Sequence, residues 1–213
     1  MKKYYDLRAP IYDEVYRRDE PERNVELYNL NSQLRRLFRR CRVLEVACGT
    51  GYWTVPLAEV AEIVVATDSS PEMLKLAADR LDGYSNLKLE LADAYDLSGV
   101  KGEFDAAVAN FWLSHIPKAK IKDFLDGLHS RLEPGSTLFM ADNMPVRGIG
   151  GEVVKGPTAE DGYKYRTLPD GSDHIVVKNY FDRNSLRNLF ADFKDSLEID
   201  VGKFYWWVSY KTS

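Results

Sequence analysis

A strict alternation of apolar strands and helices between residues 42 and 142 constrains the fold of this chain more than any other feature. Apolar strands are predicted at 42–47, 62–68, 86–91, 104–110 and 136–142. One helix is expected after the first strand and through Leu57, a second from Pro71 through Leu81, and a third over 121–132. Strands that alternate with helices form crossover units and a parallel sheet. Nearly continuous apolar strands imply that helices cover both faces of that sheet.

The flanking regions are predicted to complete a single domain over residues 1–213. Residues 1–41 are expected to form a helical cover, 42–142 the core, 143–181 a lid with a hairpin, and 182–213 a closing helix and strand. The last strand, at 204–211, is predicted to be antiparallel. The lid region holds six of the 14 glycines between residues 144 and 173. Such a stretch inside a compact domain is usually functional or mobile.

Composition narrows the class of protein. The formal net charge is -4, with 45% hydrophobic and 29% charged residues, which is typical of a soluble globular chain and gives no sign of a nucleic-acid binder. The apolar runs are too short to span a bilayer, and no apolar stretch follows the N-terminal lysines, so we expect no membrane association and a cytoplasmic location. Cys41 and Cys48 have no metal-ligand spacing, so free thiols and no metal are expected.

Acidic residues mark the ends of three successive predicted strands. Glu45 lies in the first strand, just before Gly49-Thr50-Gly51, Asp68 ends the second strand, and Asp93 follows the third. Ligands of open parallel sheets bind at the carboxyl ends of the strands. Asp68 can accept hydrogen bonds from both hydroxyls of a ribose, and Asp93 can accept one from the exocyclic amine of adenine. Singly, these residues could form a tight turn or cap a helix, but their combination favours a nucleoside site.

The loop after the first strand discriminates between nucleoside cofactors. A dinucleotide fingerprint needs a third glycine, and Thr54 stands at that position. Glu45 would repel a pyrophosphate but suits a ligand that carries an ammonium group. The pattern therefore indicates S-adenosylmethionine and disfavours a nicotinamide dehydrogenase.

Five segments resemble the motifs of the class I S-adenosylmethionine-dependent methyltransferases. They are VLEVACGTG (43–51), VVATDSSPEML (64–74), ADAYDL (92–97), FDAAVANFWLSHIP (104–117) and LEPGSTLFMAD (132–142). Ala47 and Thr50 stand where many members of the family have glycine. The resemblance implies an α/β, Rossmann-like, seven-stranded sheet, mostly parallel with an antiparallel final strand and with helices on both faces.

The resemblance also implies which residues hold the cofactor. Glu45, Ala47, Gly49 and Gly51 would surround the methionine end, Asp68, Ser69 and Met73 the ribose, and Asp93 and Ala94 the adenine. Asn110 and Phe111 would lie under the methionine and the sulfonium. Tyr5 and Tyr12 would cover the cofactor, and Cys48 and Trp53 complete the set, with the Cys48 side chain facing the pocket and mainly packing there.

A narrower resemblance concerns the acceptor. GTGYWT (49–54), FWLSHIP (111–117), RTLPDG (166–171) and IVVKNYF (175–181) are similar to segments of the phosphonate O-methyltransferases of dehydrophos biosynthesis and their relatives. The resemblance implies that Arg166 and Lys178 bind an anionic acceptor. It also implies a contribution from an N-terminal tyrosine, for which Tyr16 and Tyr28 both remain candidates.

The predicted hairpin offers a physical check on this site. If Leu168 lies opposite His174, then Arg166 lies opposite Val176, and Lys164 opposite Lys178, which places three cations on one face. Like charges on one face need an anion or nearby acids. The hairpin is therefore either an anion-binding site or a solvent-exposed element with surface lysines.

The leading hypothesis is methylation of a small molecule. An anionic phosphonate or carboxylate oxygen needs no general base, whereas a neutral hydroxyl or amine would need one, and His115 is the candidate base. His115 can also be explained as a packed or capping residue. The alternatives are a nucleic-acid or protein methyltransferase and a non-catalytic cofactor-binding partner. The expected partner is a small-molecule acceptor, with no nucleic acid and no membrane, in a monomer or homodimer.

Overall fold

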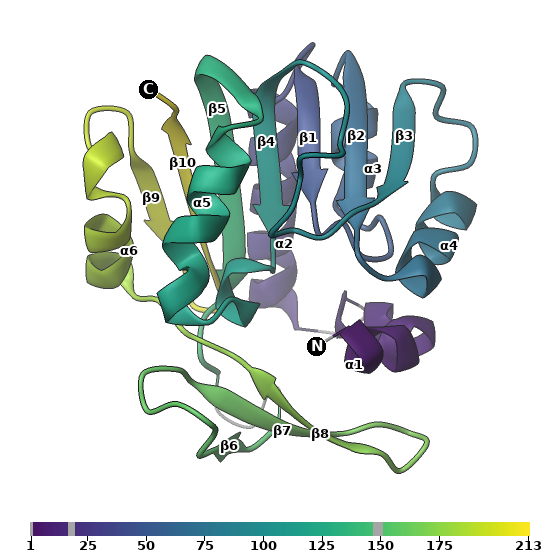
Figure 1. Ribbon diagram of the computed structural model, residues 1–213, viewed down its shortest axis with the longest axis vertical. Helices are drawn as coiled ribbons and strands as arrows, with labels where there is room; N and C mark the ends of the chain where they lie inside the picture. The colour runs from purple at the N-terminus through teal and green to yellow at the C-terminus, as the bar shows by residue number, and fades with distance from the viewer. Residues whose placement is uncertain (1, 17–19, 147–150) are drawn as a thin grey trace.

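The computed structural model describes residues 2–16, 20–146 and 151–213, so the lid glycines Gly148 and Gly150 lie outside the described residues. Its main sheet has seven strands in the order β3-β2-β1-β4-β5-β10-β9 (Figure 1). The strands are β1 (Arg42–Val46), β2 (Ile63–Asp68), β3 (Leu87–Leu91), β4 (Phe104–Asn110), β5 (Leu132–Asn143), β9 (Glu198–Val201) and β10 (Tyr205–Lys211). β1 to β5 pair in parallel, and β10 is antiparallel to both β5 and β9. The predicted Rossmann-like fold is confirmed.

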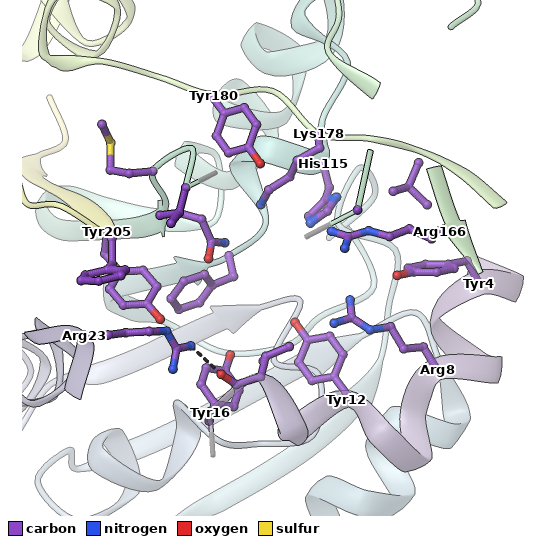
Figure 2. A pocket seen from close by; sticks show the side chains of 18 residues that line it. Tyr4, Arg8, Tyr12, Tyr16, Arg23, His115, Arg166, Lys178, Tyr180 and Tyr205 are labelled. Atoms are coloured by element: carbon purple, nitrogen blue, oxygen red, sulfur yellow. Dashed lines mark hydrogen bonds between the residues drawn. The ribbon is translucent and has the colours of Figure 1, made fainter. Parts of the chain in front are cut away.

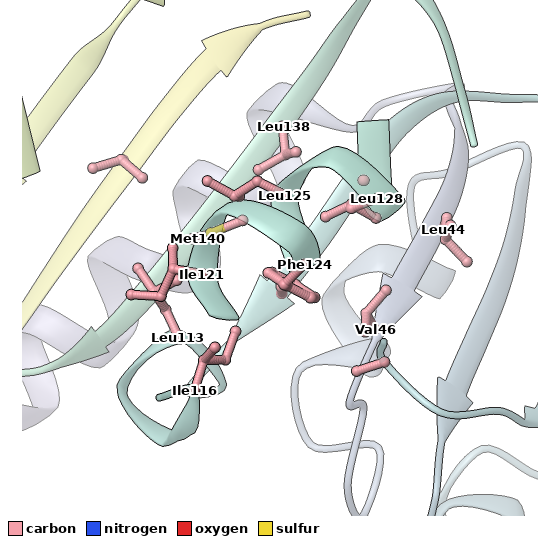
Figure 3. Packing of buried hydrophobic residues seen from close by; sticks show 14 of the residues in the cluster. Leu44, Val46, Leu113, Ile116, Ile121, Phe124, Leu125, Leu128, Leu138 and Met140 are labelled. Carbon is pink, nitrogen blue, oxygen red and sulfur yellow. The ribbon is translucent and has the colours of Figure 1, made fainter. Parts of the chain in front are cut away.

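Helices cover both faces of this sheet. They are α2 (Pro21–Leu37), α3 (Thr54–Ala58), α4 (Pro71–Arg80), α5 (Ile121–His129) and α6 (Arg183–Leu189), with short 3-10 segments at 113–115, 118–120 and 191–193. Alternate residues of β1 face opposite sides, as the pleat requires. Val43 belongs to the buried cluster that includes α2, whereas Leu44 and Val46 pack in the cluster with Phe124 of α5 (Figure 3). The apolar strands are therefore buried on both faces.

The connection between α5 and β5 differs from the prediction. The helix ends at His129, and Leu132 already belongs to β5. Phe104 pairs with Leu132 but Ala106 with Thr137, so residues 133–135 are additional on β5. The predicted turn at these residues is thus a bulge inside the strand. β9 was not predicted, because its four residues alternate between exposed and half-buried positions and carry two acids.

Of the helical cover predicted over residues 1–41, α2 packs on the sheet. The remaining part, from here on called the cover, consists of α1 (Lys2–Arg8) and a 3-10 segment, η1 (Ala9–Tyr16). In Figure 1 it lies at the carboxyl ends of the parallel strands. Two of its acids hold it there: Asp6 accepts a 2.5 Å hydrogen bond from the Ser70 hydroxyl, and Asp13 accepts one of 2.7 Å from the Thr50 hydroxyl. Asp13 also forms an ion pair with Arg80. The cover is therefore attached to the loops that follow β1 and β2.

The lid is a three-stranded antiparallel sheet of β6 (Val153–Val154), β7 (Tyr163–Thr167) and β8 (Asp173–Val177). The predicted register was wrong by two residues: Arg166 lies opposite His174, not Val176. Leu168 donates to the Ser172 carbonyl at 2.9 Å, so three residues close the turn instead of five. Gly171, at φ +81°, supplies the left-handed conformation that such a loop needs.

A shift of two residues preserves the face on which each side chain lies, because the side chains of a strand alternate with period two. Lys164, Arg166 and Lys178 therefore still share one face, as predicted.

Among the residues that the structure describes, no helix has the length and apolarity needed to cross a bilayer.

Candidate functional site

Two adjoining cavities open at the carboxyl ends of the strands. The first, here called the strand-end cavity, is lined by Tyr5, Tyr12, Ala47, Gly49, Asp68, Ser69, Met73, Ala92, Asp93, Ala94, Asn110, Phe111 and Trp112. The second, here called the lid cavity, has a volume of about 340 Å³ and lies between the cover, the lid and the sheet (Figure 2). Tyr12 and Phe111 line both cavities. The junction of the two cavities therefore lies at these two rings.

Asp68 is held rigidly at the end of β2. Its Oδ2 accepts from the Gly49 amide at 2.9 Å, and its Oδ1 accepts from the Ser70 amide, also at 2.9 Å. Burial raises the pKa of Asp68, while these amide hydrogen bonds act in the opposite direction. Each carboxylate oxygen retains acceptor capacity. The carboxylate can thus bind a vicinal diol in the strand-end cavity.

Two lining residues other than glycine have a left-handed backbone: Ala47 at φ +56° and Phe111 at φ +57°. This conformation is unfavourable for L-residues with a Cβ, and such strain gathers at functional sites. Gly49, at φ +57°, lies between them in the same cavity wall. The chain therefore turns sharply after both β1 and β4, which exposes backbone groups to a ligand.

Asn110 Oδ1, in the wall of this cavity, is a buried acceptor that lacks a hydrogen-bond partner among the described residues. Glu45 is 1% exposed, and burial raises its pKa to about 8. A buried polar group without a partner is costly. Asn110 Oδ1 suits a ligand with ammonium or hydroxyl donors, and Asp68 suits a ribose, so the residues that line the cavity fit S-adenosylmethionine.

Four of the predicted cofactor residues do not line the strand-end cavity. Glu45 is buried within the sheet, and Cys48 and Trp53 pack in a core cluster. Cys48 therefore does not face the cavity, in contrast to the prediction. Gly51 lies against α4, where an added Cβ would stand 2.8 Å from Leu81. The eleven others all line it. Ala92 and Trp112 were missed, although they are sequence neighbours of predicted residues.

Four cations line the lid cavity: Arg8, Arg23, Arg166 and Lys178 (Figure 2). Five tyrosines line it as well: Tyr4, Tyr12, Tyr16, Tyr180 and Tyr205. None of the described lining residues carries a carboxylate. A cavity with cationic and hydroxyl donors and no lining acid favours an anionic ligand.

The cations differ in how their charge is balanced. Lys178 Nζ donates to Asp142 Oδ1 at 2.9 Å and to the Ser114 hydroxyl at 2.6 Å, all of them buried. The pKa of Arg166 is lowered by burial and by the neighbouring Arg8. Its Nε is buried and has no hydrogen-bond partner among the described residues. Among the described residues Arg166 therefore has no ion-pair partner, whereas Lys178 is paired with Asp142.

His115 lines the lid cavity, and its Nδ1 lies 2.8 Å from the Val177 carbonyl oxygen. Because a carbonyl only accepts, Nδ1 carries the proton and Nε2 has the lone pair. Burial and the Lys178 charge lower the pKa of His115 strongly. The imidazole is thus neutral at physiological pH and a weak base.

The two tyrosine candidates for the acceptor site differ in position. Tyr16 lines the lid cavity, but Tyr28 is 73% exposed on α2 and does not line it. Arg8 and Arg23 were missed. Arg23 shares the spacing of Leu27, Leu30 and Leu34 on the buried face of α2, which is the signal in the sequence that could have identified it. Among the described residues no group of His, Cys, Asp or Glu is arranged to hold a metal ion.

Sequence comparison shows what this chain is similar to. A family model described as a methyltransferase domain matches residues 43–135. The demethylmenaquinone methyltransferase of Staphylococcus carnosus is 34% identical over 97 residues, 44% of this chain and 39% of the relative. The ubiquinone biosynthesis O-methyltransferase of Xanthomonas campestris is 31% identical over 135 residues, 62% of this chain and 54% of the relative. The chain thus spans about half the length of these curated relatives.

Solved structures align over nearly the whole chain. The DhpI-SAM-HEP complex matches with a TM-score of 0.76 at 25% identity, covering 97% of this chain and 94% of that one. SAM-bound CalS10, an amino pentose methyltransferase from Micromonospora echinaspora, matches with a TM-score of 0.62 at 19% identity, covering 94% and 96%. Residues 43–135 are therefore similar to a methyltransferase domain, and the fold of the chain is that of S-adenosylmethionine-dependent methyltransferases.

Proposed function

We propose that this protein transfers a methyl group from S-adenosylmethionine to an anionic oxygen, a carboxylate or a phosphonate, of a small molecule bound in the lid cavity. The observation that carries the proposal is the guanidinium of Arg166, whose buried Nε has no hydrogen-bond partner among the described residues. Arg166 is half-buried, and among the described residues it forms no ion pair, so its charge is unfavourable without an anion in the cavity. An anion in the cavity would neutralise Arg166 and accept from it in a fork.

The proposed cofactor site is the strand-end cavity. Asp68 would bind the ribose, Asp93 and Ala94 the adenine, and Asn110 with Glu45 the methionine end. When bound, S-adenosylmethionine supplies a methyl group on a positively charged sulfur. Since only Tyr12 and Phe111 line both cavities among the described residues, the methyl group and the acceptor would meet beside these rings.

The chemistry asks little of the protein beyond positioning. An ionised acceptor oxygen already carries the attacking lone pair, so no proton has to be removed. Arg166 and Lys178 would orient the acceptor, and the tyrosine rings would exclude water. One similar protein supports an oxygen acceptor, because it is named a ubiquinone biosynthesis O-methyltransferase.

A second candidate is methylation of a neutral hydroxyl or amine with His115 as the base. The side chain lines the acceptor cavity, and its Nε2 bears the lone pair that a base needs. Its lowered pKa makes it a poor proton acceptor. This property favours the anionic acceptor over the neutral one.

Calorimetry in the presence of S-adenosylhomocysteine tests the proposal. Propylphosphonate and pentanoate should bind the wild-type protein, and phenol should not. Arg166→Ala should weaken anion binding by about tenfold or more, because it removes a charge-assisted fork, while cofactor affinity stays unchanged. Arg36→Ala, an exposed arginine on α2, serves as the control. Phenol binding without anion binding, or full anion affinity in Arg166→Ala, would overturn the proposal, and His115→Gln would then test the second candidate.

A further inference from the structure

We infer that the acceptor carries two anionic groups, and that Arg23 binds the second one at the end of the lid cavity away from Arg166. This inference rests on the proposed function. Arg23 projects from the buried face of α2 and is only 6% exposed. It nevertheless lines the lid cavity. Burying a charged side chain costs free energy unless another group balances the charge.

The hydrogen bonds of Arg23 leave part of its guanidinium unused. Nη2 donates to the Val15 carbonyl at 2.5 Å, whereas Nη1 is buried and has no hydrogen-bond partner among the described residues. No ion pair joins Arg23 to a carboxylate in the part of the chain that the structure describes. A guanidinium stays charged at any physiological pH. The buried charge of Arg23 is therefore not balanced by a described residue.

The ring of Tyr205 offsets this charge only in part. The Arg23 guanidinium carbon lies 5.5 Å from the ring centroid, a cation–π contact. Such a contact stabilises the charge but gives the N–H groups no acceptor. An anionic oxygen would supply both the charge and the acceptor. Arg23 thus has a buried N–H group and a positive charge available to bind an anionic ligand.

Three of the four cations that line the cavity fall into two groups, and the fourth, Lys178, is paired with Asp142. In Figure 2, Arg23 lies with Tyr16 and Tyr205 at one end, and Arg166 lies with Arg8 and Tyr4 at the other. The two groups come from different elements: Arg23 from α2, and Arg8 and Arg166 from the cover and the lid. One anionic group cannot neutralise both. A molecule with an anionic group at each end can.

The size of the cavity limits the ligand. A volume of about 340 Å³ lies at the lower end of the range for small-molecule sites. It suits two anionic groups joined by a short carbon chain. Phosphonocarboxylates and dicarboxylates share this chemistry, so matched probes are needed to distinguish them.

Two probe pairs test the inference by calorimetry with S-adenosylhomocysteine present. They are 3-phosphonopropanoate against propylphosphonate, and glutarate against pentanoate. In the wild-type protein at least one doubly anionic probe should bind about tenfold or more tightly than its singly anionic counterpart, as one extra charge-assisted hydrogen-bonded contact implies. The pair with the larger ratio identifies the anion that the Arg166 end prefers.

Arg23→Gln should abolish this preference and leave the affinity for the singly anionic probes and the cofactor unchanged. Arg36→Gln, on the exposed face of the same helix, should leave the preference intact. Arg23→Lys keeps the charge without the fork and should retain part of the preference, which covers the case in which the glutamine variant fails to fold. Equal affinity for both members of each pair in the wild-type protein, or equal weakening of both in Arg23→Gln, would overturn the inference. Failure of every anion to bind would instead overturn the proposed function.

Discussion

At the scale of single residues, Ala47 has a left-handed backbone, which a residue with a Cβ disfavours. Its φ is +56° in the wall of the strand-end cavity, at a position where glycine would be unstrained. A Cβ in this conformation costs about 1–2 kcal/mol, and glycine costs about 0.5–1 kcal/mol through the entropy of the unfolded chain.

Ala47→Gly should therefore leave stability unchanged or raise it by up to about 1.5 kcal/mol, a gain of up to about 6 °C in Tm. Thermal unfolding without ligand measures this. Ala66→Gly is the matched control: Ala66 is buried in the extended strand β2, so the same substitution should lower Tm there. A clear drop in Tm for Ala47→Gly would show that the left-handed backbone carries no strain.

Glu45 links cofactor binding to pH. Its pKa in the folded, ligand-free protein is about 8, against an ordinary 4.5. Because the pKa of Glu45 is higher in the folded state than in the unfolded state, its protonation stabilises the fold fully below about pH 4.5. This contribution is lost as the pH rises through about 8. The carboxyl is thus largely protonated at neutral pH, and an ammonium beside it would favour the ionised form.

Binding of S-adenosylhomocysteine should consequently release a proton and tighten by up to about tenfold per pH unit between pH 6 and 8. Calorimetry in buffers of different ionisation enthalpy measures both effects. Glu45→Gln should bind more weakly and without the pH dependence. If the wild-type affinity is flat over this range, Glu45 does not interact with the ligand's ammonium.

At the scale of elements, the cover contributes residues to the walls of both cavities. Tyr5 lines the strand-end cavity, Tyr4 and Arg8 line the lid cavity, and Tyr12 lines both. Burial raises the pKa of Tyr12 to about 12, so its hydroxyl stays protonated. Loosening the cover should therefore weaken both binding events together.

Asp13→Asn removes the ion pair to Arg80 and weakens the hydrogen bond from Thr50. We expect the Kd of S-adenosylhomocysteine to rise several-fold, anion binding to weaken in parallel, and hydrogen exchange to accelerate over residues 2–16. Glu14→Gln, an exposed neighbour on the same segment, is the control. Unchanged exchange with weaker binding would show that Asp13 acts on the ligand and not through the cover.

At the scale of the whole molecule, the sheet, the cover and the lid meet at one edge. The carboxyl ends of β1, β2, β3 and β4 supply the strand-end cavity, and residues of the cover and the lid line the cavity beside it. Figure 1 shows the cover and the lid at this end of the sheet. The acids lie at the strand ends, and the cations lie in the cover, in α2 and in the lid. This separation of charge suits a positively charged donor beside a negatively charged acceptor.

The pattern of residues along the chain was sufficient to predict the parallel core and most of the residues that line the strand-end cavity. The alternation of strands and helices is a local property of the chain, so it can be recognised in the sequence. Because the carboxyl ends of parallel strands lie at one edge of the sheet, the proximity of Asp68 and Asp93 could be predicted. Cys48 and Trp53 are close in sequence to residues that line the cavity, but their side chains point into the core. The local sequence pattern does not reveal the direction of these side chains.

Which residues line the lid cavity could be seen only in the three-dimensional structure. The hairpin register depended on whether three or five residues closed the turn, and the hydrogen bonds around Ser172 settled it. The spacing of Arg23 marks a buried position, but whether that position meets the core or a cavity depends on Tyr205, 182 residues further along the chain. Such contacts arise from the packing of distant elements, and no local periodicity encodes them.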